Sequence, residues 1–146
     1  MMQSKKITLA LCAALLVVAA GCGRKPADTG TTGTTGTTVV KVTDVSLGRA
    51  IGSDKAISDS TDNFRPNDTI YASVSTEGSA SSATLRAKWS FEDGQTVDQS
   101  TQTIAPDGPK RTEFHIAKPN GWPAGKYKVE VFLNDQPAGT KSFDVK

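Results

Sequence analysis

Two stretches of the chain alternate apolar and polar side chains with a period of two. In "ATLRAKWSF" (residues 83–91) and "KYKVEVFL" (residues 126–133), the apolar positions are Leu85, Ala87, Trp89 and Phe91, and Tyr127, Val129, Val131 and Leu133. Such alternation is typical of strands with one buried and one solvated face, as in antiparallel sheets. No window of the sequence shows an amphipathic helical stripe, so the pattern predicts an all-β domain.

The remaining strands and turns are predicted from shorter signals. Further strand candidates lie at residues 39–47, 69–74, 96–104, 112–117 and 140–145. Asp93-Gly94 lies between two strands and predicts a two-residue hairpin turn, because the primed turn types need positive φ. About seven short strands with intervening Pro, Gly, Asn and Asp predict an antiparallel β-sandwich. A small closed barrel is the alternative.

The start of the chain is organised like a bacterial export signal. Residues 1–6 carry two lysines, and the apolar run of residues 7–20 is too short to span a bilayer but suits the core of a signal peptide. The run ends in "AAGC" (residues 19–22), which resembles the lipobox of bacterial lipoproteins. This resemblance implies that residues 1–21 are a lipoprotein signal peptide and that Cys22 is lipidated. An ordinary secretory signal followed by a chance cysteine is the alternative.

The resemblance also implies where the protein is located. Cys12 would be removed with the signal peptide, so the mature chain has one cysteine and no internal disulfide. Each buried acyl methylene contributes about 0.8 kcal/mol, so fatty acyl chains such as palmitate on Cys22 would hold the protein in the membrane. Gly23 is not Asp, which by resemblance to the enterobacterial sorting rule favours the outer membrane, facing the periplasm.

Residues 22–38 are predicted to form a linker. They contain the lipidated Cys22 and a Gly/Thr-rich segment that repeats Gly-Thr-Thr three times. This segment has no large apolar side chain to bury, so it is expected to be disordered. As a flexible chain it would span about 20–25 Å. A plain spacer is favoured over a glycosylated stalk or a wall-spanning segment, and residues 39–146 are left as the folded domain.

One stretch in the folded domain resembles part of the immunoglobulin fold. Gly125, two residues before Tyr127, is followed by alternating valines, as at the start of strand F in immunoglobulin-like domains. The resemblance implies that Tyr127 forms the tyrosine corner and that Trp89 is the buried tryptophan of strand C. Val129 stands where antibody domains have cysteine, so apolar packing replaces the disulfide.

The resemblance extends over the whole domain. Residues 39–146 are similar to the immunoglobulin-like domains of uncharacterised proteobacterial lipoproteins. The motifs that carry this likeness are "FRPNDTIYA", "WSFEDGQ" and "GWPAGKYKVEV". It implies a fold and no particular activity, because such folds host many functions.

Charge and chemistry exclude several functions. Of the 17 basic residues, two lie in the predicted signal peptide, and the other 15 are matched by 15 acidic residues. No basic excess remains for nucleic-acid binding. His115, the single histidine, is predicted on the solvated face of its strand with no nucleophile beside it. The sequence has no nucleophile elbow, metal-spaced His/Cys cluster or phosphate loop, so neither an enzyme nor a cofactor is predicted.

The acidic segment at residues 52–68 offers an alternative function. Asp54, Asp59 and Asp62 could contribute to a calcium site, which needs six to eight oxygen ligands. Their spacing lacks the alternate ligands and the glycine of an EF-hand. A solvated loop without a metal is therefore favoured. The alternative is an envelope sensor that binds calcium or a small ligand here.

A binding surface is predicted on one face of the sheet. If residues 85–91, 127–133 and 140–145 pair as strands C, F and G, the outer face gathers Arg86, Lys88, Lys128, Glu130 and Phe132. Phe132 is then an aromatic side chain that points into solvent, as binding interfaces often have. Cover by the loop at Trp122-Pro123 is the alternative.

Taken together, these patterns predict a non-catalytic binding or structural accessory module of the bacterial cell envelope, anchored through Cys22. Its partner is expected to be another envelope protein, with a cell-wall glycan as the less favoured choice.

Overall fold

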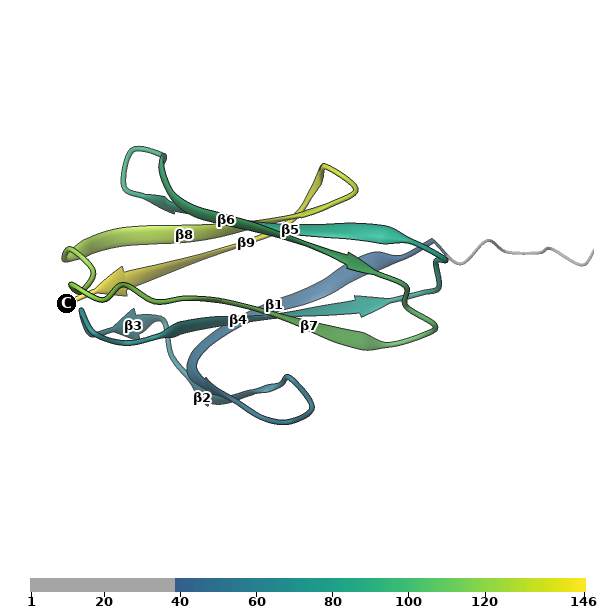
Figure 1. Ribbon diagram of the computed structural model, residues 1–146, viewed down its shortest axis with the longest axis horizontal. Coiled ribbons are helices and arrows are strands. Elements are labelled where there is room, and N and C mark those ends of the chain that lie inside the picture. Colours follow the sequence, from purple (N-terminus) through teal and green to yellow (C-terminus); the bar gives the residue numbers. More distant parts are fainter. Residues whose placement is uncertain (1–38) are drawn as a thin grey trace, which may run out of the picture. The chain divides into compact units, whose positions relative to one another are not determined.

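The computed structural model describes residues 39–146, which form nine β-strands (Figure 1). The strands are β1 (Lys41–Ile51), β2 (Ile57–Ser60), β3 (Asn63–Phe64), β4 (Ile70–Glu77), β5 (Ala83–Phe91), β6 (Gln95–Ile104), β7 (Lys110–Ile116), β8 (Gly125–Leu133) and β9 (Gln136–Val145). Between residues 39 and 146 there is no helix that could cross a membrane.

The strands form two sheets that pack face to face. One sheet has the order β2-β1-β4-β7 and the other the order β3-β9-β8-β5-β6. All pairs are antiparallel except the short parallel pair β3–β9. Figure 1 shows β1 beginning at one end of the sandwich and the C-terminus lying at the opposite end. The predicted β-sandwich is confirmed, and the two additional strands, β2 and β3, lie in the segment predicted as a loop.

The core consists of the apolar positions of the alternating strands. Trp89 on β5 is fully buried and lies opposite the equally buried Val129 on β8. The Phe143 ring packs edge-on against Trp89, with 6.0 Å between centroids, and stacks on Tyr127 at 5.3 Å. Each buried side chain of this size contributes about 1.5–3 kcal/mol. Apolar packing therefore occupies the site where antibody domains have their disulfide.

One end of the sandwich is closed by a tryptophan and a tyrosine. The Tyr127 hydroxyl donates a 2.8 Å hydrogen bond to the Pro123 carbonyl, and the Trp122 indole N–H donates to the Asp68 carbonyl at 3.2 Å. The two rings meet edge to face, with 6.1 Å between centroids. The predicted tyrosine corner is thus confirmed, and Trp122 packs beside it.

The two-residue hairpin turn is not at the predicted place. Residues 92–94 form a three-residue loop between β5 and β6, so the turn predicted at Asp93-Gly94 is wrong in length. The two-residue turn joins β8 to β9 at Asn134-Asp135, whose φ angles are 49° and 64°. Asn and Asp tolerate the left-handed conformation better than other non-glycine residues, and positive φ at both positions is typical of a type I′ turn.

Candidate functional site

The outer face of β5 and β8 brings together the residues of the predicted binding surface. Strand register places Arg86 opposite Phe132 and Lys88 opposite Glu130, and Lys128 lies one step further along the same face of β8. The residues between them on both strands point into the core, because side chains alternate along a strand. We call these five residues the β5–β8 face.

Phe132 is on the predicted side of the sheet, but it does not point freely into solvent. The ring is half-buried, and the Arg86 guanidinium lies over it, 4.1 Å from the ring centroid. Arg86 also contacts the exposed Asp135 carboxylate at 3.2 Å. Phe132 is therefore covered by Arg86. The predicted alternative, cover by the loop at Trp122-Pro123, named the wrong residues. A guanidinium stacked on an aromatic ring at such a site is worth about 0.5–1 kcal/mol.

The remaining charges of the β5–β8 face are only partly paired. Lys128 and Glu130 form an ion pair at 3.3 Å on the same strand. Lys88 has no ion-pair partner within residues 39–146, although it lies directly across from Glu130 in the register. Beside the arginine-capped ring, the face therefore presents an ammonium group that is available to a carboxylate from outside.

His115 lies on the outer face of the other sheet. It is exposed between the buried Phe114 and Ile116, as its strand pattern predicts. Its Nδ1 is 2.9 Å from a carboxylate oxygen of Glu113, and its ring packs at a tilt against Tyr71. Within residues 39–146, the polar side chain that contacts His115 is therefore a carboxylate, not a nucleophile.

The acidic segment does not gather its carboxylates. Asp54 contacts Arg111 at 3.4 Å, and Asp59 contacts Arg49 at 3.5 Å. Asp62 instead accepts a hydrogen bond from the side-chain amide of its neighbour in the chain. Within residues 39–146, no three His, Cys, Asp or Glu side chains are placed to hold a metal ion together.

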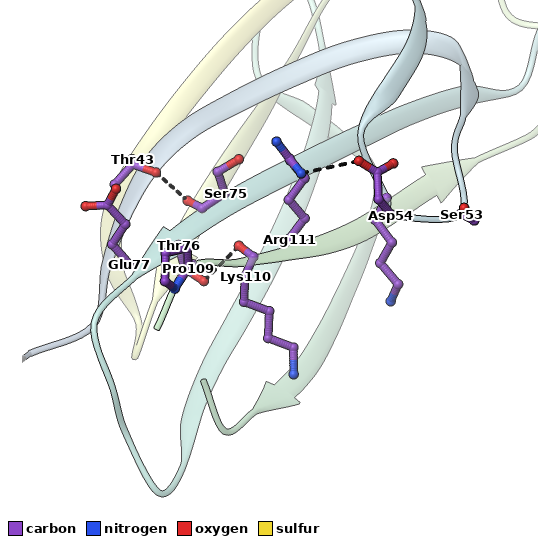
Figure 2. A pocket seen from close by; sticks show the side chains of 10 residues that line it. Thr43, Ser53, Asp54, Ser75, Thr76, Glu77, Pro109, Lys110 and Arg111 are labelled. Atoms are coloured by element: carbon purple, nitrogen blue, oxygen red, sulfur yellow. Dashed lines mark hydrogen bonds and ion pairs between the residues drawn. The ribbon is translucent and has the colours of Figure 1, made fainter. Parts of the chain in front are cut away.

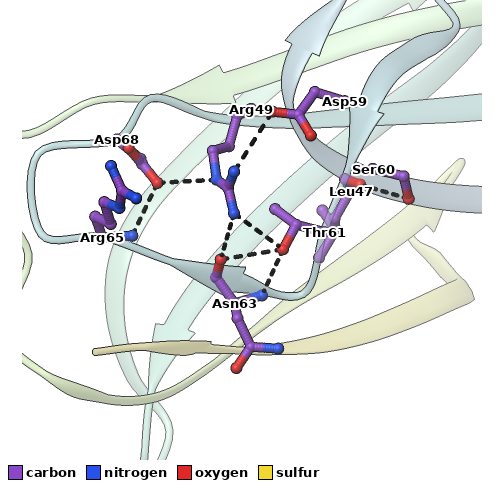
Figure 3. Close-up of polar contacts among 8 residues, drawn as sticks. All are labelled: Leu47, Arg49, Asp59, Ser60, Thr61, Asn63, Arg65 and Asp68. Carbon is purple, nitrogen blue, oxygen red and sulfur yellow. Dashed lines mark hydrogen bonds and ion pairs between the residues drawn. The ribbon is translucent and has the colours of Figure 1, made fainter.

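Arg49 organises this segment, as Figure 3 shows. Its Nε lies 3.2 Å from the Asp68 carboxylate, and its Nη2 donates to the backbone carbonyl of Asn63 at 3.2 Å. Asp68 in turn accepts a 2.8 Å hydrogen bond from the backbone N–H of Arg65. Asp59 and Asp68 therefore hold the segment against β1 through their contacts with Arg49. Sequence reasoning missed this role, because the partners of Arg49 are separated from it along the chain.

A second surface feature lies on the outer face of β1, β4 and β7, next to the β1–β2 loop (Figure 2). It is a shallow cavity of about 570 Å³. Its charged lining residues are Asp54, Lys55, Glu77, Lys110 and Arg111. Arg111 is paired with Asp54, and the Thr43 hydroxyl donates to the Ser75 carbonyl at 3.3 Å. With both signs of charge and partly satisfied polar groups, the cavity has no marked preference for one kind of ligand.

The fold places the described chain in the class of immunoglobulin-like β-sandwiches. Among solved structures, it is similar to an immunoglobulin-like protein from Pseudomonas aeruginosa, at 18% identity and a TM-score of 0.50, covering 76% of this chain and 99% of that one. It is also similar to part of a β-glucosidase from Listeria innocua, at 7% identity and a TM-score of 0.50, covering 74% of this chain and 16% of the enzyme. No family model and no curated protein matches the sequence. At these identities the likeness shows the fold alone.

Proposed function

We propose that the protein is a membrane-anchored lipoprotein of the bacterial envelope and that its immunoglobulin-like domain is a non-catalytic binding module. The domain would bind another envelope protein through the β5–β8 face. The observation that carries this proposal is the Phe132 ring capped by Arg86, beside the charged side chains of the β5–β8 face. Arginine and aromatic residues, phenylalanine included, are enriched in protein–protein interfaces relative to the rest of the surface.

The proposed anchor rests on the sequence. The signal peptide (residues 1–21), Cys22 and the linker (22–38) lie outside the described residues. Two observations support a domain that starts at the predicted boundary: Val40 is buried, and β1 begins at Lys41. The proposed location is the outer membrane, with the domain facing the periplasm.

The anchor can be tested by metabolic labelling with palmitate. We expect the wild-type protein to incorporate the label and to fractionate with membranes, and we expect Cys22→Ala to lose both properties. Ser4→Ala is the matched control, because the same export signal is altered without loss of the cysteine. Label that persists in Cys22→Ala, or a wild type found in the soluble fraction, would overturn the anchor.

The chemistry of the β5–β8 face indicates the kind of partner. The Lys88 ammonium can donate to a carboxylate. The Phe132–Arg86 stack can pack against a flat apolar or aromatic side chain. A partner surface that combines acidic and apolar side chains would satisfy both. Charged groups at such a rim mainly affect the association rate and specificity, while the stacked aromatic contributes more to the lifetime of the complex.

Photocrosslinking in living cells tests the binding proposal. A benzophenone side chain is placed at Phe132, with a control at His115 on the opposite sheet. We expect a discrete adduct with one envelope protein from position 132 only, and we expect Lys88→Glu to weaken it several-fold. No adduct at 132, or the same adduct at both positions, would contradict the proposal.

A further inference from the structure

Strand β6 is an outer strand whose second side is unpaired in the described part of the chain. It is the last strand in the order β3-β9-β8-β5-β6, and among residues 39–146 its backbone pairs only with β5. Of its ten residues, all but Ser100 and Ile104 are exposed. An edge of this kind presents a row of free backbone N–H and C=O groups that can pair with another strand.

Half of this edge lacks the features by which proteins normally block such pairing. Asp98 is the only charged residue of β6, and the register with β5 shifts at Val97, near the turn end of the strand. Residues 99–104, "QSTQTI", contain no charge, proline or glycine. The outer strand of the other sheet, β7, contains two basic residues and one acidic residue. Residues 95–98 of β6 are therefore protected against pairing with another strand. Residues 99–104, the open half of β6, are not.

The open half of β6 is held in an extended shape by contacts on its inner side. Ser100 and Gln102 lie opposite the buried Ala87 and Leu85 of β5, and the Gln102 side chain donates to the Glu113 carbonyl of β7. The strand therefore needs little ordering before it pairs, which lowers the entropic cost of association.

We propose that β6 pairs antiparallel with β6 of a second copy of this chain, about a two-fold axis near Thr101. In this register Thr101 lies opposite Thr101 of the second copy, and Gln99 lies opposite Thr103. Asp98 then faces Ile104, so no like charges are opposed across the pair. Threonine pairs across strands are favourable. Residues 99–104 carry no charge, so they offer no opposite charge that would favour a charged peptide. An equally uncharged strand, such as β6 of a second copy, fits this edge better.

The dimer joins two five-stranded sheets edge to edge. The two-fold axis runs perpendicular to the sheet, so the β5–β8 faces of both copies lie on the same side. Pairing of one strand from each copy buries less than about 1,000 Å², which is typical of weak and transient complexes. The dimer is therefore expected to form where the local concentration is high.

Disulfide trapping of the full chain in cells tests this proposal. We expect Thr101→Cys to give a dimer linked through position 101, identified by mass spectrometry of the linked peptide, at least ten times more abundant than the dimer from His115→Cys. Mass spectrometry separates this link from any disulfide at Cys22. A link from position 101 only to another protein, or no link at all, would overturn the proposal.

Two charge variants make the test specific for the register. In the Thr101→Cys background, Gln99→Lys with Thr103→Lys places lysines opposite one another across the dimer, whereas Gln99→Lys with Thr103→Glu places opposite charges there. We expect the first to abolish the link and the second to keep it. All substituted side chains are exposed, so both variants should fold. Equal trapping in both variants would contradict the proposed pairing. The adduct at Phe132 is read separately, so either proposal can fail alone.

Discussion

The hydroxyl of Tyr127 donates a 2.8 Å hydrogen bond to the carbonyl of Pro123, four residues earlier in the chain. The same ring stacks on Phe143 with an interplanar angle of 12° and meets the edge of Trp122. One side chain thus fixes the loop before β8 and joins it to the core. The stability of this end of the sandwich should depend on that hydroxyl.

Removing the hydroxyl alone should weaken the fold. Tyr127→Phe keeps the ring packing but leaves the Pro123 carbonyl without its donor, so the free energy of unfolding should fall by about 1 kcal/mol. Urea denaturation of the wild type and the variant measures the difference. Tyr71→Phe is the control, because Tyr71 is only half-buried, and it should change stability by less than about 0.5 kcal/mol. Equal losses in both variants would contradict the role of the corner.

The same tyrosine should make stability depend on pH in alkaline solution. Burial raises the pKa of Tyr127 above its ordinary value of 10.0, and the carboxylate of Glu92 raises this pKa further. Above pH 10 the unfolded chain therefore loses this proton while the folded chain keeps it, so stability decreases as the pH rises. The stability difference between the wild type and Tyr127→Phe should shrink in this range. A difference that stays constant with pH would contradict the raised pKa.

Loss of the Arg49 contacts should cost more than loss of an exposed ion pair. Arg49→Met removes the contact with the largely covered Asp68 at 3.2 Å, and leaves this carboxylate without its cation. We expect a loss of about 1–2 kcal/mol in urea denaturation. Lys41→Met removes the exposed pair with Glu77 and should cost about 0.5 kcal/mol or less. If the two variants lose the same free energy of unfolding, Arg49 does not hold the segment of residues 52–68 against β1.

A side chain at Gly48 should push β2 away from β1. A β-carbon there would collide with the Asp59 carbonyl and the Ile57 side chain, whereas one at Gly94 has no heavy atom within 4 Å. We expect trypsin to cleave Gly48→Ala after the exposed Lys55 faster than it cleaves the wild type. Gly94→Ala has only the backbone cost of its φ of 96° and should be cleaved at the wild-type rate. Identical digestion patterns would show that β2 tolerates the side chain.

Calcium should not stabilise the domain. Asp54 and Asp59 are each paired with an arginine, and in the described residues 39–146 no three carboxylates are placed to hold a cation together. A cation that bound the folded state would raise the melting temperature by mass action. We expect no shift on adding millimolar calcium chloride and none on adding a chelator. A rise that Asp59→Asn abolishes would instead revive the calcium-sensor alternative.

The sequence predicted the core well and the rest of the fold less completely. Alternation in β5 and β8 is a local pattern, so it identified the buried side of both strands, Trp89 and Val129 included. The strands β2 and β3 are short, and the contacts of Arg49 with distant residues hold them in place. The position of β6 at the end of a sheet depends on strand order, which no local pattern of polar residues contains.

The placement of the residues of the β5–β8 face was predicted to a similar extent, and their binding role stays a prediction. Strand register brings Arg86, Lys88 and Phe132 together as expected, because alternation determines the side of the sheet on which each residue lies. The cover of Phe132 by Arg86 depends on rotamers and on the hairpin turn at Asp135, which the sequence pattern does not encode. No charge pattern distinguished the carboxylates that pair with arginine from those that stay solvated.

The positions of the first and last strands of the domain have a mechanical consequence. β1 starts at one end of the sandwich and β9 finishes at the other, in different sheets (Figure 1). Tension applied between the two ends therefore pulls both terminal strands along their length, across hydrogen bonds that run perpendicular to the strands. The seven paired positions between β1 and β4 would then resist as a group in shear, and would not open one after another. A domain with this geometry is suited to bearing load between its two ends.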